Sequence, residues 1–219
     1  MMVDGDRVVG EYILDVPRLR QFIEAVNTIR AASDDPQEII TGIRPHFAEL
    51  LADQGWLPER YQEPFEGSGM GSGIGMWLLY RATDGSLAFS SLVVPSGQQT
   101  PVHDHLAWGL VGLYRGKQDE DVFVRRDDGA DPERAELDLV EQHQLIPGNF
   151  YELLPENDIH RVRTTSPETS VSLHLLGNDN GCIWRHRYHP DKSLVEPFRS
   201  GYVNINCQEI ASAETKDKT

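Results

Sequence analysis

Cysteine is scarce in this chain of 219 residues, and long apolar runs are lacking. The two cysteines, Cys182 and Cys207, lack Cys-x-x-Cys spacing, which predicts a reducing compartment rather than a disulfide scaffold. No apolar run approaches the roughly 18 residues that a membrane span needs, and no apolar segment typical of a secretion signal is found near the N-terminus. We therefore expect a soluble, cytoplasmic protein that has no membrane partner.

Basic residues are also few. The chain has 20 lysines and arginines against 35 aspartates and glutamates, which gives a formal net charge of −15. A field of this sign repels a phosphate backbone, so we expect no nucleic-acid partner. For the same reason, an anionic small molecule would need a local arginine in order to bind. The length is that of one domain with a substantial core.

The first third of the chain has helical periodicity. Apolar residues recur every three or four positions between Val16 and Ile29, and Asp15 is placed to cap that segment. A second apolar stripe runs from Ile39 to Leu51. The sequence therefore predicts two helices before any strand.

The ends of these helices carry their own signals. Asp35–Glu38 resembles a capping box with proline at the first helical position, and Pro45 is expected to kink or split the second helix. A glycine-rich junction comes next, at 67–75. We predict a helical N-terminal cap over residues 1–66, packed on the remainder of the domain.

From residue 76 the pattern changes to short β-rich runs separated by Gly, Pro and Asp turns. Nine short strands at this spacing favour an antiparallel sandwich or a small barrel over 67–206, with a disordered tail at 207–219. The predicted strands are 76–82, 87–94, 109–115, 120–126, 137–145, 150–154, 159–165, 169–177 and 182–189.

Three histidines have the spacing of a metal site. His103 and His105 lie one residue apart at the start of a strand-like run, so their side chains point to the same face. His160 follows a Pro-x-Asn turn on a predicted returning strand. Three neutral nitrogen ligands leave coordination positions open, which is what a metal needs in order to do chemistry.

The surrounding residues resemble two known motifs. The string GQQTPVHDHLAWGLVGLYRG (97–116) has the spacing of the first cupin motif, and PENDIH (155–160) resembles the second. The glutamate ligand that usually follows the second histidine of the first motif is absent, because Gly109 and Leu110 stand there. The site should therefore consist of three histidines.

The sequence thus resembles cupins, and among them the thiol dioxygenases, namely cysteine dioxygenase and, more closely, bacterial 3-mercaptopropionate dioxygenase. The strings TPVHDHLAWGLVGLYRG, DIHRV and SVSLHLLGNDNGCIWRHRYHP carry the likeness, which covers about residues 76–190. It implies a mainly β fold, the cupin double-stranded β-helix or jelly-roll barrel. It also implies that His103, His105 and His160 bind Fe(II), and that the thiol of a small carboxylate is oxidised by O₂ to a sulfinate.

The same resemblance points to residues around the metal. Thiol dioxygenases carry a Ser-x-His-x-Tyr relay that hydrogen-bonds toward the iron site. Ser172 and His174 match its first two positions, and Leu176 stands where the tyrosine would be. We expect Ser172 and His174 to take part in catalysis by ordering the outer sphere of the iron.

One arginine is the leading candidate for holding a substrate carboxylate. Arg185 lies where 3-mercaptopropionate dioxygenases carry an arginine in their Arg-His string, and Arg187 shares its strand face. Guanidinium groups bind carboxylates through two parallel hydrogen bonds. Cysteine dioxygenase would hold its substrate from an arginine near Trp77, which this chain lacks. A substrate similar to 3-mercaptopropionate or mercaptosuccinate is therefore favoured over free cysteine.

Two other interpretations stay open. A metal-dependent cupin of other chemistry would be a C–C-cleaving dioxygenase, or a non-redox isomerase or lyase with Zn, Mn or Ni, and Leu176 favours it. A non-catalytic alternative is a ligand-sensing module whose acidic surface binds a protein partner. The sequence leaves the oligomeric state open.

Overall fold

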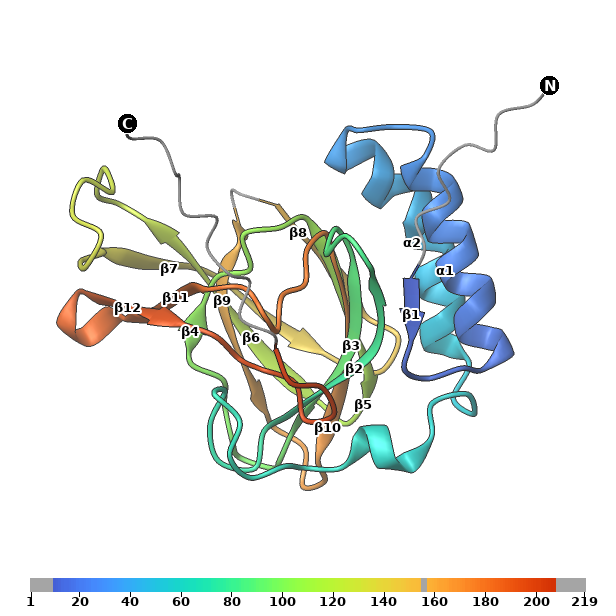
Figure 1. Cartoon of the computed structure of the whole chain (residues 1–219). Helices are drawn as coiled ribbons and strands as arrows, with labels where there is room; N and C mark the ends of the chain where they lie inside the picture. Colours follow the sequence, from blue (N-terminus) through green and yellow to red (C-terminus); the bar gives the residue numbers. More distant parts are fainter. Residues whose placement is uncertain (1–9, 155–156, 208–219) are drawn as a thin grey trace, which may run out of the picture.

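The chain folds into two antiparallel β-sheets with helices on one side (Figure 1). The computed structural model describes residues 10–154 and 157–207. The first sheet has the order β1 (Gly10–Tyr12), β2 (Gly75–Ala82), β3 (Ala88–Val94), β10 (Ser170–Leu176), β5 (Gly109–Arg115) and β8 (Phe150–Leu153). The second has the order β12 (Leu194–Phe198), β11 (Arg185–His189), β4 (Val102–His103), β9 (Ile159–Thr164), β6 (Gln118–Arg125) and β7 (Leu137–Leu145). The predicted double-stranded β-helix with an N-terminal helical cap is confirmed.

Each predicted strand has an observed counterpart, and three further strands were not predicted. Alternation cannot reveal β4, because it contains only two residues. The other two, β1 and β12, lie at sheet edges, where only one neighbour constrains the residue pattern, and β12 contains Pro197. The sequence therefore predicts every strand with two neighbours except β4, together with the edge strands β7 and β8.

The first helix, α1 (Pro17–Arg30), begins without a side-chain cap. Val16 occupies the cap position, and Asp15 forms an ion pair with Arg20 instead, so the prediction that Asp15 caps this helix is wrong. An exposed carboxylate can pair with a guanidinium one turn into the helix as readily as with a free backbone N–H. The helix is stabilised by its buried face, which consists of Leu19, Phe22, Ile23 and Val26.

The second helix, α2 (Pro36–Ala52), does begin at a capping residue. The side chain of Asp35 accepts a hydrogen bond from the backbone N–H of Gln37 at 2.8 Å. The helix runs without a break through Pro45, so it is not split. A short 3₁₀ helix, η1 (Glu59–Gln62), then leads toward the barrel.

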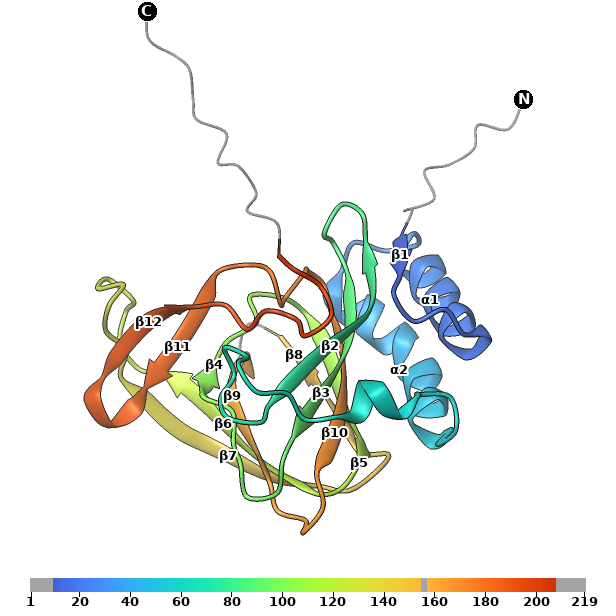
Figure 2. The same cartoon turned by 60° about the horizontal axis from the view of Figure 1, so that its bottom comes forward.

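The helical cap and the first sheet share one core (Figure 2). Phe22 of α1 lies with its ring centre 5.2 Å from that of Phe89, and Phe47 of α2 lies 5.7 Å from Phe150. Gly112 of β5 leaves the room for α2, because a methyl group there would come within 2.7 Å of the Phe47 ring. The outer face of this sheet is therefore shaped to receive the helices.

The two cysteines are bonded to each other. Cys182 and Cys207 form a disulfide, with Cα atoms 5.1 Å apart, so the expectation of a chain without disulfides is wrong. The chain returns between them through the β11–β12 hairpin, which brings the two residues together. Of the predicted tail at 207–219, only Cys207 belongs to the described residues, and the remainder lies outside them.

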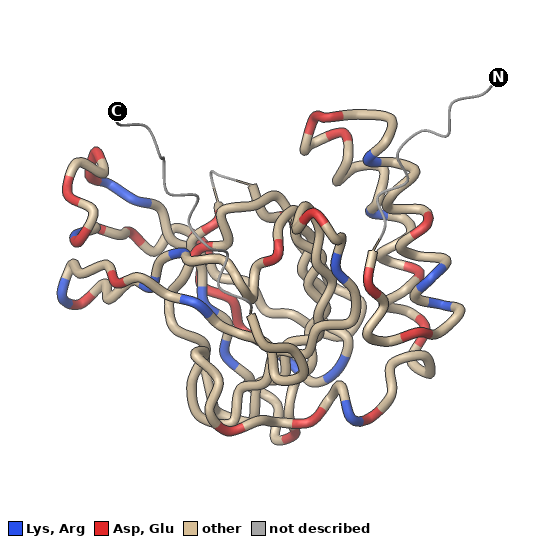
Figure 3. The backbone as a smooth tube through the Cα atoms, in the orientation of Figure 1, with Lys and Arg blue, Asp and Glu red and all other residues tan. Residues whose placement is uncertain are grey.

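Two global features concern the surface. No helix within residues 10–154 and 157–207 combines the length and apolar character that crossing a bilayer demands. Acidic side chains outnumber basic ones and lie on the helical cap and the barrel alike (Figure 3).

The shared core can be tested at Phe47, which is fully buried. Replacing Phe47 by Ala should lower the free energy of unfolding by about 3–5 kcal/mol, because the ring fills space between the helices and the first sheet. Glu49→Ala, at an exposed position of the same helix, should stay within about 0.5 kcal/mol of the wild type. Urea unfolding measures both, and a small loss for Phe47→Ala would contradict a shared core.

Candidate metal centre

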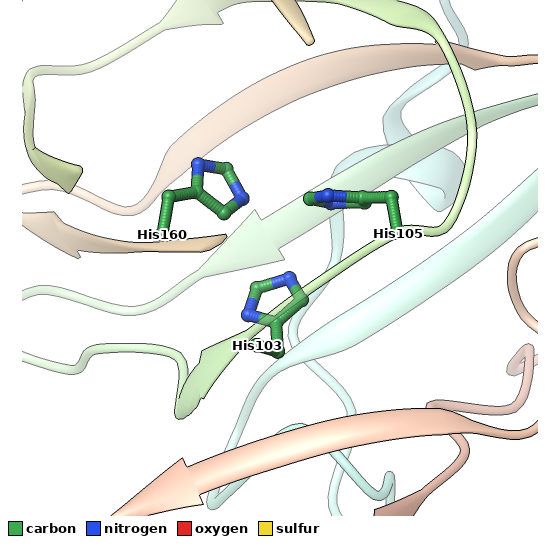
Figure 4. Close-up of side chains that lie close together, drawn as sticks. All are labelled: His103, His105 and His160. Carbon is green, nitrogen blue, oxygen red and sulfur yellow. The ribbon is translucent and has the colours of Figure 1, made fainter. Parts of the chain in front are cut away.

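The three predicted histidines come together inside the barrel (Figure 4). His103 ends β4 and pairs directly with His160 on β9, and opposite residues of an antiparallel pair share a face. His105 follows two residues after His103 and turns its ring toward the other two. One nitrogen of each ring lies within 4.8 Å of the others, and each residue is at most 2% exposed. This group could hold a metal ion.

The Nδ1 atom of each ring, on the side away from the other two rings, lies within hydrogen-bond distance of an oxygen atom. The Nδ1 atom of His103 lies 2.9 Å from the carbonyl oxygen of Pro101, and that of His105 lies 3.0 Å from Asp158 Oδ1. The Nδ1 atom of His160 lies 2.7 Å from Glu120 Oε1. An imidazole that donates from Nδ1 carries its lone pair on Nε2, so all three rings offer a lone pair toward the centre.

The residues fit a metal ion chemically. The Nε2 atom of His160 is buried without a hydrogen-bond partner among the described residues. A buried polar atom without a hydrogen-bond partner lowers the stability of the folded protein unless a ligand binds to it. Three imidazoles are a donor set that Zn, Fe, Cu and Ni accept. A metal ion at the centre would supply the partner that His160 lacks.

Burial keeps two of these ligands neutral. It holds the pKa of His103 and of His105 well below the usual range of an imidazole. The charge of Arg185 acts in the same direction on His103, and the neighbouring His160 ring acts on His105. The rings of His103 and His105 are therefore unprotonated at neutral pH, and a metal does not have to displace a proton from these two.

Ser172 and His174 lie on β10, and both are buried. The Ser172 Oγ and His174 Nε2 atoms are 2.9 Å apart, within hydrogen-bond distance. Burial lowers the pKa of His174 to about 3, and the His160 ring adds to this effect. Leu176 points into an apolar cluster with Val111 and Leu153. The structure thus brings the predicted Ser172 and His174 together, and the apolar side chain of Leu176 lies beyond them on the same strand.

Arg185 is a buried cation close to the histidines. The residue is 2% exposed, and burial lowers its pKa to about 10, so the guanidinium stays charged at neutral pH. Nη1 donates to the carbonyl oxygen of Asp104 at 2.7 Å, and Nη2 donates to Ser200 Oγ at 3.1 Å. Its Nε is buried without a partner among the described residues, and the charges of Asp104 and Asp158 act on the guanidinium from nearby. The guanidinium lies 4.4 Å from the ring centre of Phe198.

Asp104, between the first two histidines, faces away from the centre. Its Oδ2 atom lies 2.6 Å from His186 Nδ1 and accepts from the Tyr188 hydroxyl at 3.0 Å. It therefore orients His186 rather than one of the three central rings.

Two important acids were not found by sequence reasoning. Asp158 accepts hydrogen bonds from the backbone N–H groups of His105 and Leu106 as well as facing the His105 ring. Glu120 faces the His160 ring. Alternation along β6 could have found Glu120, because it shares the buried face of that strand with Gln118 and Val122.

Comparison with known proteins supports no closer assignment. No protein-family profile matches the chain. Similar solved structures include the cupin domain of Cnp3 from Schizosaccharomyces pombe, with 12% identity, a TM-score of 0.37, and 48% of this chain and 61% of that chain covered. Another is an RmlC-like cupin family protein with a double-stranded β-helix fold from Methanocaldococcus jannaschii, with 14% identity, a TM-score of 0.35, and 49% and 82% covered.

The DMSP lyase DddQ from Ruegeria pomeroyi is also similar, with 21% identity, a TM-score of 0.37, and 64% of each chain covered. This chain spans less than two thirds of the length of the Cnp3 domain and of the lyase. Identities and TM-scores this low carry no argument about activity. The fold and the three rings on their own define the class: a double-stranded β-helix protein with a buried three-histidine site that could bind a metal.

The lowered pKa of His174 predicts how stability depends on pH in the metal-free protein. The unfolded chain binds a proton at this residue below about pH 6.5, whereas the folded protein does not until about pH 3. Folding stability should therefore fall with decreasing pH across that window, by up to about 1.4 kcal/mol per pH unit from this residue. Urea unfolding between about pH 6 and pH 4 should give a shallower dependence for His174→Gln than for the wild type. Equal slopes would show that His174 is not held neutral.

Proposed function

We propose that this chain is a cupin enzyme, a mononuclear non-haem Fe(II) thiol dioxygenase. Its substrate would be a small thiol carboxylate similar to 3-mercaptopropionate, which O₂ converts to the sulfinate. The observation that carries the proposal is the pairing of three buried imidazoles with a buried guanidinium whose Nε has no hydrogen-bond partner among the described residues. This arrangement suits a metal ion beside a small anion.

The metal would be held by His103, His105 and His160, each through Nε2. When bound, Fe(II) supplies the redox chemistry that allows a thiolate and O₂ to combine. Because the three ligands are neutral, an anionic thiolate can approach the site without excess negative charge. The buried rings also keep the site away from bulk water.

Arg185 would bind the substrate carboxylate. A guanidinium has five N–H donors. One on Nη1 and one on Nη2 are used by Asp104 and Ser200, while Nε has no partner among the described residues. The bonds to Asp104 and Ser200 hold the plane of the group, so it is oriented before the substrate arrives. A bound carboxylate would also compensate a positive charge that is otherwise buried.

Ser172 and His174 would order the outer sphere of the site. Their mutual hydrogen bond fixes both side chains on the β10 strand, and the low pKa keeps His174 neutral. A neutral imidazole can accept or donate a single hydrogen bond at each nitrogen, so the pair can hold a proton between Oγ and Nε2.

A second candidate function keeps the metal and changes the reaction. Leu176 packs with Val111 and Leu153, so a phenol is absent from the place where thiol dioxygenases carry one. This observation favours a C–C-cleaving dioxygenase, or a non-redox isomerase or lyase that uses Zn, Mn or Ni.

Metal analysis and an oxygen electrode distinguish the two candidates. Protein purified without added metal should contain iron, and the Fe(II)-loaded protein should consume O₂ with 3-mercaptopropionate, giving one sulfinate per O₂. Free cysteine should be a poorer substrate, because its ammonium group would have to approach a buried guanidinium of the same charge. Abundant zinc or nickel, together with no O₂ uptake across short thiols, would instead favour the second candidate.

The role of Arg185 can be tested separately from the metal. Arg185→Ala should lower kcat/KM for 3-mercaptopropionate by about 10- to 100-fold, because hydrogen bonds to a charged group are worth about 1.5–3 kcal/mol. The loss should appear mainly in KM, with metal content unchanged. Oxidation of 2-mercaptoethanol, which has no carboxylate, provides the matched control and should change little. An equal loss for both thiols would remove the assignment.

A further inference from the structure

Behind the His160 ring lies a carboxylate that is almost completely buried. Glu120 on β6 is 1% exposed, and its Oε1 atom is 2.7 Å from His160 Nδ1. Its Oε2 atom is 3.0 Å from Nδ1 of His143, its register partner on β7. The hydroxyl of Tyr151 on β8 lies 3.3 Å from the same Nδ1 atom of His160. Side chains from three other strands therefore meet around this acid.

All of these neighbours can act as donors, which is the environment of an ionised carboxylate. His160 and His143 each present Nδ1 to a different oxygen of the carboxylate, at 2.7 and 3.0 Å. Glu120 is thus a buried negative charge in a fixed position.

The three central rings are not supported in the same way. His103 faces a neutral carbonyl oxygen. The acid behind His105, Asp158, divides its oxygens between that ring and two backbone N–H groups. Glu120 accepts no backbone hydrogen bond in the described structure, and its contact with His160 is the shortest of the three. The acid with the shortest of these contacts therefore stands behind His160, whose Nε2 is buried without a partner among the described residues.

We propose that Glu120 is a positioning residue that makes His160 an effective metal ligand. It holds the proton of His160 on Nδ1, turns Nε2 toward His103 and His105, and strengthens the ring as a donor through its negative charge. His143 holds the other oxygen of the carboxylate from the side away from His160. The inference rests on the proposed metal site and deepens it, because it assigns that site an anionic support outside the ligand set.

His143 also connects this network to the surface. Its side chain is 42% exposed, and its Nε2 atom lies 3.1 Å from Glu141. His143 therefore connects the Glu120 carboxylate to solvent, and His160 connects it to the proposed metal. His160, Glu120 and His143 form a continuous hydrogen-bonded line from the centre of the barrel to its outer face.

The inference can be tested by metal affinity, with a control on the same strand. Glu120→Gln keeps the size of the side chain but removes the charge, and it should weaken Co²⁺ binding by about 10- to 100-fold in chelator competition. Asp121→Asn removes a carboxylate from the next residue, which faces outward and pairs with Arg161, so its affinity should stay within about twofold. His160→Ala marks complete loss of the site.

The visible absorption bands of bound Co²⁺ provide a second measurement, because they report the field of the ligands. They should shift in Glu120→Gln and stay in place in Asp121→Asn. If the glutamine variant does not fold, Glu120→Asp takes its place: the charge stays, but the shorter side chain withdraws from His160, and the affinity should fall.

The outcomes separate this inference from the proposed function. A wild-type protein that binds neither Co²⁺ nor Fe²⁺ would overturn the metal site itself. A wild type that binds, with unchanged affinity and bands in a folded Glu120 variant, would overturn only the role of Glu120.

Discussion

The register between two short strands is the constraint on which the site depends. β4 and β9 meet so that His103 stands directly opposite His160, which puts both rings on the inner face of the second sheet. A slip of one residue would turn one ring outward, since side chains alternate along a strand. The pairing of β9 with β6 places Glu120 next to the same position, because Val122 is the partner of His160 and Glu120 lies two residues away. The pairing of β9 with β4 and with β6 thus positions the proposed ligand His160 together with Glu120, the acid behind it.

Several charged groups are buried close together around the three rings. Burial holds the rings of His103 and His105 neutral. Glu120 and Asp158 stand behind two of the rings, and the charges of Asp104 and Asp158 act on Arg185 nearby. Carboxylates behind the rings orient them and offset part of the charge that a divalent ion would bring.

Local patterns allowed much of this structure to be predicted from sequence. Alternation identified the long strands, and the spacing of His103, His105 and His160 identified rings that do lie together. Asp119, Glu120 and Asp121 are consecutive acids of similar chemistry; alternation along β6 could single out Glu120 as buried, but the contact of its carboxylate with His160 depends on the packing of β6 against β9.

Sequence patterns likewise do not predict contacts between residues that are distant in the sequence. The Cys182–Cys207 bond depends on the path of 25 residues, which composition does not encode. That bond closes a ring of chain that contains Arg185 and also Ser200, the residue that holds one of its amino groups. Thiols attack disulfide bonds, so a thiol substrate of the kind proposed would also be a reagent for exchange at Cys182–Cys207, the bond that closes the ring containing Arg185.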